Sequence, residues 1–439
     1  MENVFLVGVH VKKSGTKPQD SQNSLDELGR LVETAGGVVG GRTLQSLDSP
    51  SPATLIGKGK VEELRQTVLR EKFKSVVFDE ELKPAQQKKL AELIPAKILD
   101  RTRLILDIFA KRARTREGIL QVELAQLSYM LPRMTERYGR FEQQVGGIGT
   151  RGPGERKLEV EARHIRDRVS HLKKQIDSVR LHREIARERR HAVPLPVITI
   201  VGYTDAGKST LLNKLVELYG EKTEPIYADN KLFATLDPTT RRIRMPSGRW
   251  ALFTDTVGFI DKLPLNLIAA FRSTLEETLD ADILVHLIDA TDKNMERHVR
   301  TVFDILDSLA PQKRHDAGKV LTAFNKTDLL SRSEKLKLEN RPLFPGKDGP
   351  DDAGSAPVHL SAALGTGVNR LLSLIEEKLS GGMMETDVFV PFKKSAMLAS
   401  LYRLGKVEEV THKKSGVYLH LKLEKSHWDR LKKILHEGK

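Results

Sequence analysis

The sequence predicts an α/β fold of several domains, and three observations support this prediction. Short apolar runs alternate with amphipathic runs near the N-terminus, long charged helical patterns follow, and a strand–glycine loop–helix pattern opens the second half. We expect an N-terminal α/β domain at 1–110 and a basic helical hairpin at 111–192. A domain with a mixed sheet and helices on both faces should cover 193–382, and a small α+β domain 383–439.

The composition is that of a folded protein rather than a disordered one. Hydrophobic residues make up 39% of the 439 positions and charged residues 30%. There are no cysteines, which excludes disulfides, thiolate zinc sites and cysteine nucleophiles and fits a reducing compartment. We find no apolar run of about 18 residues and no signal peptide. These features predict a cytoplasmic protein without a membrane span, which we expect to be a monomer.

The net charge of +14 is concentrated in one fifth of the chain. Between Arg101 and His191 there are 22 Lys and Arg residues against 12 Asp and Glu residues. A solvated helical face would explain such a run. The alternative is a surface for a polyanion, most simply nucleic acid. The high share of arginine favours this alternative, because a planar guanidinium group can donate two hydrogen bonds to one phosphate.

The N-terminal segment alternates between strand and helix patterns. Strands are expected at 4–11, 37–44 and 75–79, and helices at 25–36, 60–72 and 84–94. Gly36 should end the first helix, and Pro84 should begin the last. Strands that alternate with helices predict a parallel sheet.

Two long helical patterns then follow. Residues 101–131 read as one helix, which Pro132 and Gly139 should break. Residues 155–190 read as a second helix with apolar residues at every third or fourth position. These are Leu158, Ala162, Ile165, Val169, Leu172, Ile176 and Val179. With the glycine-rich stretch 146–155 between them, the two patterns predict an antiparallel helical hairpin.

Beyond Pro194 and Pro196 a new domain begins, with strands and helices alternating to about residue 381. The stretch GYTDAGKS, Gly202 to Ser209, matches the G-x-x-x-x-G-K-[ST] pattern and lies between an apolar run and a helical run, as that motif requires. Lys208 would neutralise the β- and γ-phosphates of a nucleotide, and the Ser209 hydroxyl would bind Mg²⁺. The tail, 386–439, reads as strand, helix, hairpin, helix.

Three further motifs follow in order and predict guanine specificity. DTVG (255–258) offers Asp255 to Mg²⁺ and the Gly258 amide to the γ-phosphate. In NKTD (325–328), Asp328 can accept two hydrogen bonds from guanine that adenine cannot donate. SAA (361–363) can donate a backbone N–H to guanine O6. Four motifs in this order, each after a strand, predict a P-loop GTPase domain.

The switch I threonine must lie between the P-loop and DTVG. LFATLDPTTR (232–241) offers Thr235, Thr239 and Thr240, and FATL resembles the segment of translation-type GTPases, which favours Thr235. We expect Lys208, Thr235 and Gly258 to be catalytic, and Ser209, Thr235 and Asp255 to bind Mg²⁺. The expected GTP contacts are Gly202, Tyr203, Thr204, Asp205, Ala206, Gly207, Lys208, Ser209, Thr210, Phe233, Ala234, Thr235, Leu236, Asp237, Asp255, Thr256, Val257, Gly258, Asn325, Lys326, Thr327, Asp328, Ser361, Ala362 and Ala363.

Phe259 follows DTVG, where Ras-like enzymes carry a water-orienting glutamine. No arginine finger is identifiable from the sequence. We therefore expect turnover that is slow alone and is stimulated by a large partner.

The whole pattern resembles the HflX family of ribosome-associated GTPases. The resemblance rests on GYTDAGKST, LFATLDPT, DTVGFIDKLP, NKTD, SA, GGIGTRGPGE and TLIGKGKVEEL, and it covers roughly residues 1–380. It implies binding to the large (50S) ribosomal subunit and the splitting or rescue of stalled or idle ribosomes. It also implies that the glycine loop reaches toward the peptidyl-transferase centre.

The resemblance gives the glycine loop a role in contacting ribosomal RNA, although an ordinary flexible connection would also fit. Glycine lets the backbone pack close to RNA, and Arg151 can pair with phosphate or stack on a base. The expected RNA contacts are Gly146, Gly147, Gly149, Arg151, Gly152, Gly154, Arg156 and Lys157.

One residue departs from the family pattern. The family usually has asparagine in the P-loop where this chain has Asp205. In related GTPases that asparagine can help hold a monovalent cation, so K⁺ is a further candidate cofactor beside Mg²⁺, or Asp205 is a tolerated variant. Two other functions stay open: an RNA-stimulated nucleotidase or RNA remodeller that also uses ATP, and a regulatory GTP switch for a protein partner.

Overall fold

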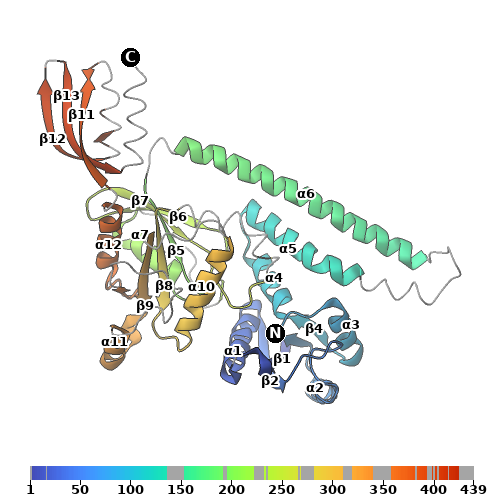
Figure 1. The fold of residues 1–439 in the computed structure, drawn as a ribbon. Helices are drawn as coiled ribbons and strands as arrows, with labels where there is room; N and C mark the ends of the chain where they lie inside the picture. The colour runs from blue at the N-terminus through green and yellow to red at the C-terminus, as the bar shows by residue number, and fades with distance from the viewer. Residues whose placement is uncertain are drawn as a thin grey trace.

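The computed structural model of this chain contains two α/β units, a pair of long helices and an antiparallel sheet at one end (Figure 1). The residues that it describes are 2–15, 17–135, 153–190, 195–221, 232–233, 236–264, 267, 281–309, 319–339, 357–380, 383–392, 398, 401–402, 405–413 and 415–424. The predicted fold class is confirmed. Within these ranges, no helix combines the length and the apolar character needed to cross a membrane.

The N-terminal sheet is parallel throughout, with strand order β2-β1-β3-β4. Its elements are β1 (Glu2–Val11), η1 (Lys12–Ser14), α1 (Pro18–Ala35), β2 (Gly37–Leu47), α2 (Lys58–Glu71), β3 (Ser75–Phe78), α3 (Pro84–Leu93) and β4 (Lys97–Asp100). Gly36 ends α1 in the left-handed region at φ 95°, and Pro84 opens α3, as predicted. The sequence pattern does not predict β4, because four residues are too few to show strand periodicity.

Three helices follow this sheet: α4 (Arg101–Arg112), α5 (Arg116–Thr135) and α6 (Pro153–Arg190). Helices α5 and α6 run side by side in opposite directions (Figure 1). Arg168 of α6 donates two hydrogen bonds, of 2.7 and 2.9 Å, to the carboxylate of Glu123 in α5. The two helices therefore pack as the predicted antiparallel pair.

The prediction of one helix over 101–131 is wrong. Helix α4 ends at Arg112, because Ala113 is extended with ψ 120°. The backbone amides of Arg114 and Thr115 then bind the carboxylate of Asp237, each at 2.9 Å, instead of helix carbonyls. A contact from a distant segment thus divides the helical pattern.

The expected break at Pro132 is also wrong, because α5 continues to Thr135. Arg133 stabilises this last turn. Its guanidinium lies 3.4 Å from the centroid of the Tyr129 ring and donates to the Leu82 carbonyl at 2.8 Å and to Asp100 at 3.2 Å. These tertiary contacts offset the backbone hydrogen bond that proline removes.

The central sheet has strand order β10-β9-β8-β5-β7-β6, and only the β6–β7 pair is antiparallel among its described pairings. Its elements are β5 (Val197–Val201), α7 (Lys208–Tyr219), β6 (Thr239–Arg244), β7 (Trp250–Asp255), β8 (Ile283–Asp289), α10 (Met295–Leu309), β9 (Val320–Asn325), η4 (Thr327–Leu329), α11 (Arg332–Glu339), β10 (Val358–His359) and α12 (Val368–Ser380). Because β5 lies between β7 and β8, the P-loop after β5 is placed among the carboxyl ends of three parallel strands.

The C-terminal sheet is antiparallel, with strand order β11-β13-β12. Its strands are β11 (Met383–Pro391), β12 (Gly405–Lys413) and β13 (Gly416–Glu424). The helix expected after the hairpin falls at 425–439, outside the described residues, as does most of the segment between β11 and β12.

One buried cluster joins the two α/β units. Phe109 of α4 meets Phe233 edge-on, with ring centroids 4.6 Å apart. Tyr129 of α5 and Phe259 are buried in the same cluster. The N-terminal unit is therefore packed directly against segments that surround the P-loop.

Candidate nucleotide site

The P-loop connects β5 to α7, and its first and last glycines have no room for a side chain. A Cβ on Gly202 would lie 2.3 Å from the Leu287 carbonyl oxygen, and one on Gly207, at φ 90°, would lie 2.3 Å from the Asn325 amide nitrogen. Between them, Tyr203, Thr204 and Ala206 are buried. The loop is thus held closely against β8 and β9.

Lys208 begins α7 and turns its ammonium group back into this loop. Its Nζ donates to the carbonyls of Gly202 at 3.1 Å and Tyr203 at 2.8 Å. Burial lowers the pKa of Lys208 to about 8, although the charges of Asp255 and Asp205 oppose the shift. A buried cation at a helix N-terminus is a site for phosphate.

Ser209 and Asp255 meet at the end of β7. The Ser209 hydroxyl donates to Asp255 Oδ2 at 2.6 Å, and both residues are buried. A hydroxyl and a carboxylate side by side are the hard oxygen donors that Mg²⁺ prefers. These two residues fit the ion, which would neutralise the negative charge of the phosphates. Thr210 follows on α7 and is partly exposed.

Gly258 lies beside Thr204 of the P-loop and the ammonium group of Lys208. A Cβ on Gly258 would be 2.7 Å from Thr204 Cγ2 and 3.2 Å from Lys208 Nζ. The two described residues of the predicted catalytic set, Lys208 and Gly258, are therefore neighbours. The third, Thr235, and the adjacent Ala234 lie outside the described residues.

Phe259 is 1% exposed and packs in the shared core. Its backbone pairs with the P-loop: Thr204 N donates to Phe259 O at 2.7 Å, and Phe259 N donates to Gly202 O at 3.2 Å. The side chain that replaces the water-orienting glutamine is thus directed into the core. Val257 and Thr256 before it are buried too, and the Thr256 hydroxyl donates to the Ile200 carbonyl at 2.8 Å.

The guanine motifs meet at Asn325. Its amide nitrogen donates to the Ala206 carbonyl at 2.8 Å, and its oxygen accepts from the Ala362 amide at 2.8 Å. Asn325 therefore connects the P-loop to the SAA motif. The Thr327 hydroxyl donates to the Leu360 carbonyl at 2.9 Å, which braces the same corner.

Asp328 and Ala363 are exposed beside this corner. Ser361 is buried, and its hydroxyl accepts from the Leu364 amide at 3.2 Å. The Ala362 amide is bound to Asn325, whereas Ala363 is exposed.

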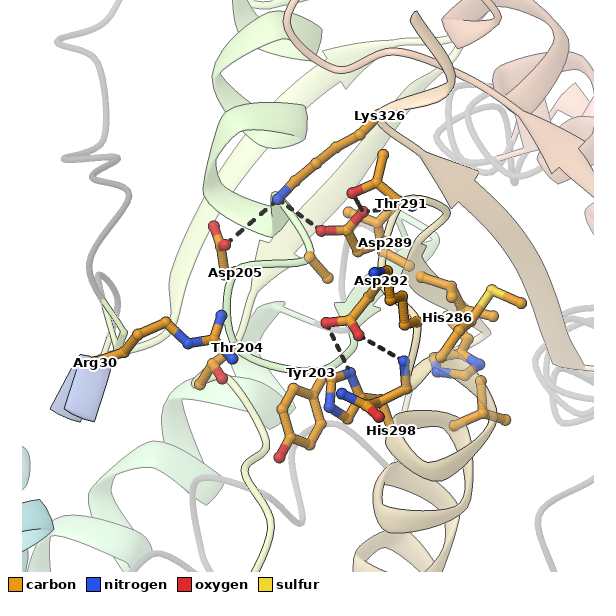
Figure 2. Close-up of a pocket in the computed structure, with 17 residues that line it drawn as sticks. Arg30, Tyr203, Thr204, Asp205, His286, Asp289, Thr291, Asp292, His298 and Lys326 are labelled. Carbon is orange, nitrogen blue, oxygen red and sulfur yellow. Dashed lines mark hydrogen bonds and ion pairs between the residues drawn. The ribbon is translucent and has the colours of Figure 1, made fainter. Parts of the chain in front are cut away.

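Lys326 adopts a left-handed backbone conformation, with φ 62°. Its ammonium lies 2.7 Å from Asp289 and 3.4 Å from Asp205. Burial lowers the pKa of Lys326, but these two carboxylates outweigh that effect and raise it above its ordinary value. The Asp205 carboxylate is thus directed toward Lys326 (Figure 2).

The described switch I residues face the N-terminal unit. Phe233 and Leu236 are buried in the shared core. The Asp237 carboxylate binds the amides of Arg114 and Thr115 and the Thr115 hydroxyl. Asp237 therefore contacts the α4–α5 junction, and Phe233 packs against Phe109 of α4.

Five of the eight predicted RNA-binding residues lie outside the described residues. Gly146, Gly147, Gly149, Arg151 and Gly152 lie there. The other three belong to the first turns of α6, where no side chain is described: Gly154, Arg156 and Lys157.

The structure also contains a cavity of about 400 Å³ between the P-loop, the end of β8 and the start of α10 (Figure 2). P-loop residues, the start of α10 and Arg30 of α1 line it. In this region Tyr203 stacks on His298, with ring centroids 3.7 Å apart, and its hydroxyl donates to Glu27 of α1 at 2.7 Å. Sequence reasoning missed these contacts because they join segments that share no pattern.

Four family models match successive parts of the chain. They describe a GTP-binding GTPase N-terminal region (residues 22–110), a GTP-binding GTPase middle region (112–190), a 50S ribosome-binding GTPase (197–326) and an HflX C-terminal domain (352–439). The last match extends the likeness beyond residue 380, where the motif resemblance ended.

Two relatives that match over nearly their whole length agree with these family matches. The GTPase HflX of Lacrimispora saccharolytica is 39% identical over 418 residues, which cover 95% of this chain and 92% of the relative. That of Escherichia coli is 37% identical over 433 residues, covering 98% and 95%. A GTP-binding protein of Sulfolobus solfataricus, solved with GDP, is 23% identical with a TM-score of 0.43, covering 86% of this chain and 98% of its own.

Proposed function

Because this chain belongs to the HflX family of GTPases, we propose that it hydrolyses GTP on the large ribosomal subunit and uses GTP-bound closure of its switches to split or rescue stalled or idle ribosomes. Its central domain matches the 50S ribosome-binding GTPase family. The observation that carries the proposal is the contact of Asp237 with the start of α5. It joins switch I to the helix pair that presents the basic surface.

Guanine nucleotides are the expected ligands. The phosphates would lie between Lys208 and Gly258, with Mg²⁺ on Ser209 and Asp255. The guanine base would contact Asp328 and Ala363, next to Asn325, which connects the P-loop to the SAA motif. Paired hydrogen bonds of this kind discriminate strongly against a base that cannot make them.

Hydrolysis should be slow without a partner. Phe259 is directed into the core and cannot orient water. The proposed switch I threonine, Thr235, would have to bind Mg²⁺ to close the site. Such closure is an order–disorder step that a partner surface can favour.

The basic helix α6 is the proposed ribosomal RNA surface. Arg163, Arg166, Lys173 and Lys174 are exposed along it, and the Arg168–Glu123 pair holds it on α5. The glycine loop at 146–155 would contact RNA at the end of this pair. Phosphate contacts of this type weaken steeply with salt.

Co-sedimentation with 70S ribosomes and isolated 50S subunits tests the proposal. The full-length protein is loaded with a non-hydrolysable GTP analogue or with GDP, beside a variant whose residues 146–155 are replaced by a short Gly/Ser turn. We expect the analogue to promote 50S binding and the 70S particles to separate, and we expect the variant to do neither.

The alternatives give other outcomes. Binding that ignores both nucleotide and loop would reduce α6 to a general RNA surface, and the splitting role would be withdrawn. Stimulation by free RNA with ATP would favour an RNA remodeller. A complex with another protein that resists salt would favour a regulatory switch.

A further inference from the structure

Arg30 is the cationic residue that the N-terminal unit contributes to the cavity beside the P-loop. It is exposed on α1 and lines the cavity together with Tyr203, Thr204 and Asp205. Figure 2 shows its side chain extending from α1 toward Thr204. Among the described residues, its guanidinium has no hydrogen bond and no ion pair. An arginine held beside a P-loop without a partner is available for a phosphate.

The acids around this cavity already have partners. Asp289 pairs with Lys326 at 2.7 Å and accepts from the Thr291 amide at 2.9 Å. Asp292 accepts from the Asn294 amide at 2.7 Å and lies 3.5 Å from His298 Nδ1. Asp205 lies 3.4 Å from Lys326. The charge of Arg30 is therefore not committed to any of them.

The position of Arg30 is set by its own helix. Glu27, one turn earlier on the same face of α1, accepts the hydrogen bond of Tyr203 and pairs with the guanidinium of Arg101. Arg101 also binds Asp79 at 2.8 Å, and all of these residues are buried. This network holds α1 against the P-loop and so fixes the position of the Arg30 backbone beside the cavity.

Thr204 gives a second, independent indication. It is 7% exposed, and its hydroxyl has no hydrogen-bond partner in the described structure. It lies against Gly258, which neighbours the Lys208 ammonium. A buried hydroxyl without a partner beside the expected γ-phosphate points to a ligand that completes this corner.

We propose that Arg30 is an arginine finger that the N-terminal unit supplies to the GTP site of the same chain. This inference rests on the proposed GTPase function. In hydrolysis, a water oxygen bonds to the γ-phosphorus as the bond from that phosphorus to the β–γ bridging oxygen breaks. The water loses a proton to solvent, and the bridging oxygen leaves with the bonding electron pair on GDP. Arg30 donates N–H hydrogen bonds to the oxygens on which negative charge grows, and it transfers no proton.

The test compares Arg30→Ala and Arg30→Lys with a control, Arg65→Ala, in the full-length protein. Arg65 is exposed on α2 and pairs with Glu62. Three quantities are measured: single-turnover hydrolysis at saturating GTP with and without 50S subunits, affinity for GDP and a GTP analogue, and binding of GDP with aluminium fluoride, which mimics the transferring phosphoryl group.

We expect Arg30→Ala to lose at least tenfold in rate, against the 10³–10⁵ that a fully placed arginine finger contributes. The aluminium fluoride complex should be lost while GDP affinity and melting temperature are kept. Arg30→Lys should recover little, because an ammonium lacks the planar fork, and Arg65→Ala should match the wild type.

Wild-type hydrolysis by Arg30→Ala in both conditions would overturn the assignment. An equal loss of GTP affinity or a lowered melting temperature would also overturn it, because Arg30 would then serve ground-state binding or domain packing. Failure of the wild type to respond to 50S subunits would instead count against the proposed function, and the aluminium fluoride arm would still report on Arg30.

Discussion

The Tyr203 hydroxyl of the P-loop donates a 2.7 Å hydrogen bond to the carboxylate of Glu27 in the N-terminal unit, 176 residues away in the sequence. The same hydroxyl accepts from the Asp261 amide at 2.8 Å, in the segment that follows DTVG. Lys262 beside it pairs with Asp79 and Glu80 of the N-terminal unit. The P-loop and the segment that follows DTVG are thus both attached to the N-terminal unit.

Tyr203→Phe removes this hydroxyl and should weaken the attachment. It leaves a buried carboxylate with one donor fewer and the Asp261 amide without its acceptor, so the free energy of unfolding should fall by about 1–3 kcal/mol. Thermal unfolding measures this, with Tyr402→Phe as the control, since Tyr402 is 54% exposed. Equal melting temperatures for the two variants would show that the hydroxyl adds nothing to docking.

Asp237→Ala should release the start of α5. The variant loses the acceptor for the Arg114 and Thr115 amides, a capping interaction worth about 1 kcal/mol. Hydrogen exchange of the peptide 114–120 should quicken, and its expected difference between the GDP and GTP-analogue forms should disappear. Asp107→Ala, which removes a surface ion pair on α4, is the matched control. Protection at 114–120 that survives the change would rule out a switch I connection to α5.

Nucleotide affinity should decline above pH 8. The pKa of Lys208 is lowered to about 8 by burial, so the free protein loses the ammonium charge as the pH rises, whereas a bound phosphate favours the charged form. Affinity should fall toward tenfold per pH unit beyond this value, because binding then takes up one proton. Titration with fluorescent GDP between pH 7 and 9 checks this. Lys208→Arg stays charged and should show a flatter profile; identical profiles would exclude Lys208 as the cause.

Acid should destabilise the fold through His286. Burial, reinforced by the Lys208 charge, lowers the pKa of His286 to about 3. Between the ordinary value of 6.5 and this value, the unfolded chain binds a proton that the folded chain excludes. The contribution of neutral His286 to the free energy of unfolding is therefore fully present above pH 6.5. It falls as the pH drops, by up to about 1.4 kcal/mol per pH unit.

Denaturant unfolding across pH 7 to 4 checks this dependence. His286→Gln should show a shallower fall than the wild type, whereas His412→Gln, at an exposed position of β12, should not. If the wild type and His286→Gln lose stability in parallel, the acid sensitivity has another origin.

Asp205→Asn tests the proposed K⁺ site. The Asp205 carboxylate lies 3.4 Å from the Lys326 ammonium, whose charge competes with a cation there. An amide pairs more weakly with Lys326 and leaves its oxygen available, so the ratio of GTP hydrolysis rates in KCl and NaCl should rise above that of the wild type. Equal ratios for both proteins would argue against a cation at this position.

The sequence by itself determined the features that neighbouring residues encode. The P-loop, DTVG, NKTD and SAA motifs each follow a strand, and parallel strands end at one edge of a sheet, so their convergence could be predicted. Gly36 and Pro84 marked helix boundaries for the same local reason, since each acts through its own backbone conformation.

The tertiary structure alone decided the contacts between distant segments. Asp237 divides α4 from α5, Glu27 receives Tyr203, and α1 carries Arg30 to the rim of the P-loop. None of these has a sequence signature, because a hydrogen bond between residues more than a hundred positions apart depends on how separate units pack. The meeting of the nucleotide-binding motifs could therefore be predicted from the sequence, whereas their attachment to the N-terminal unit depends on how the folded units pack.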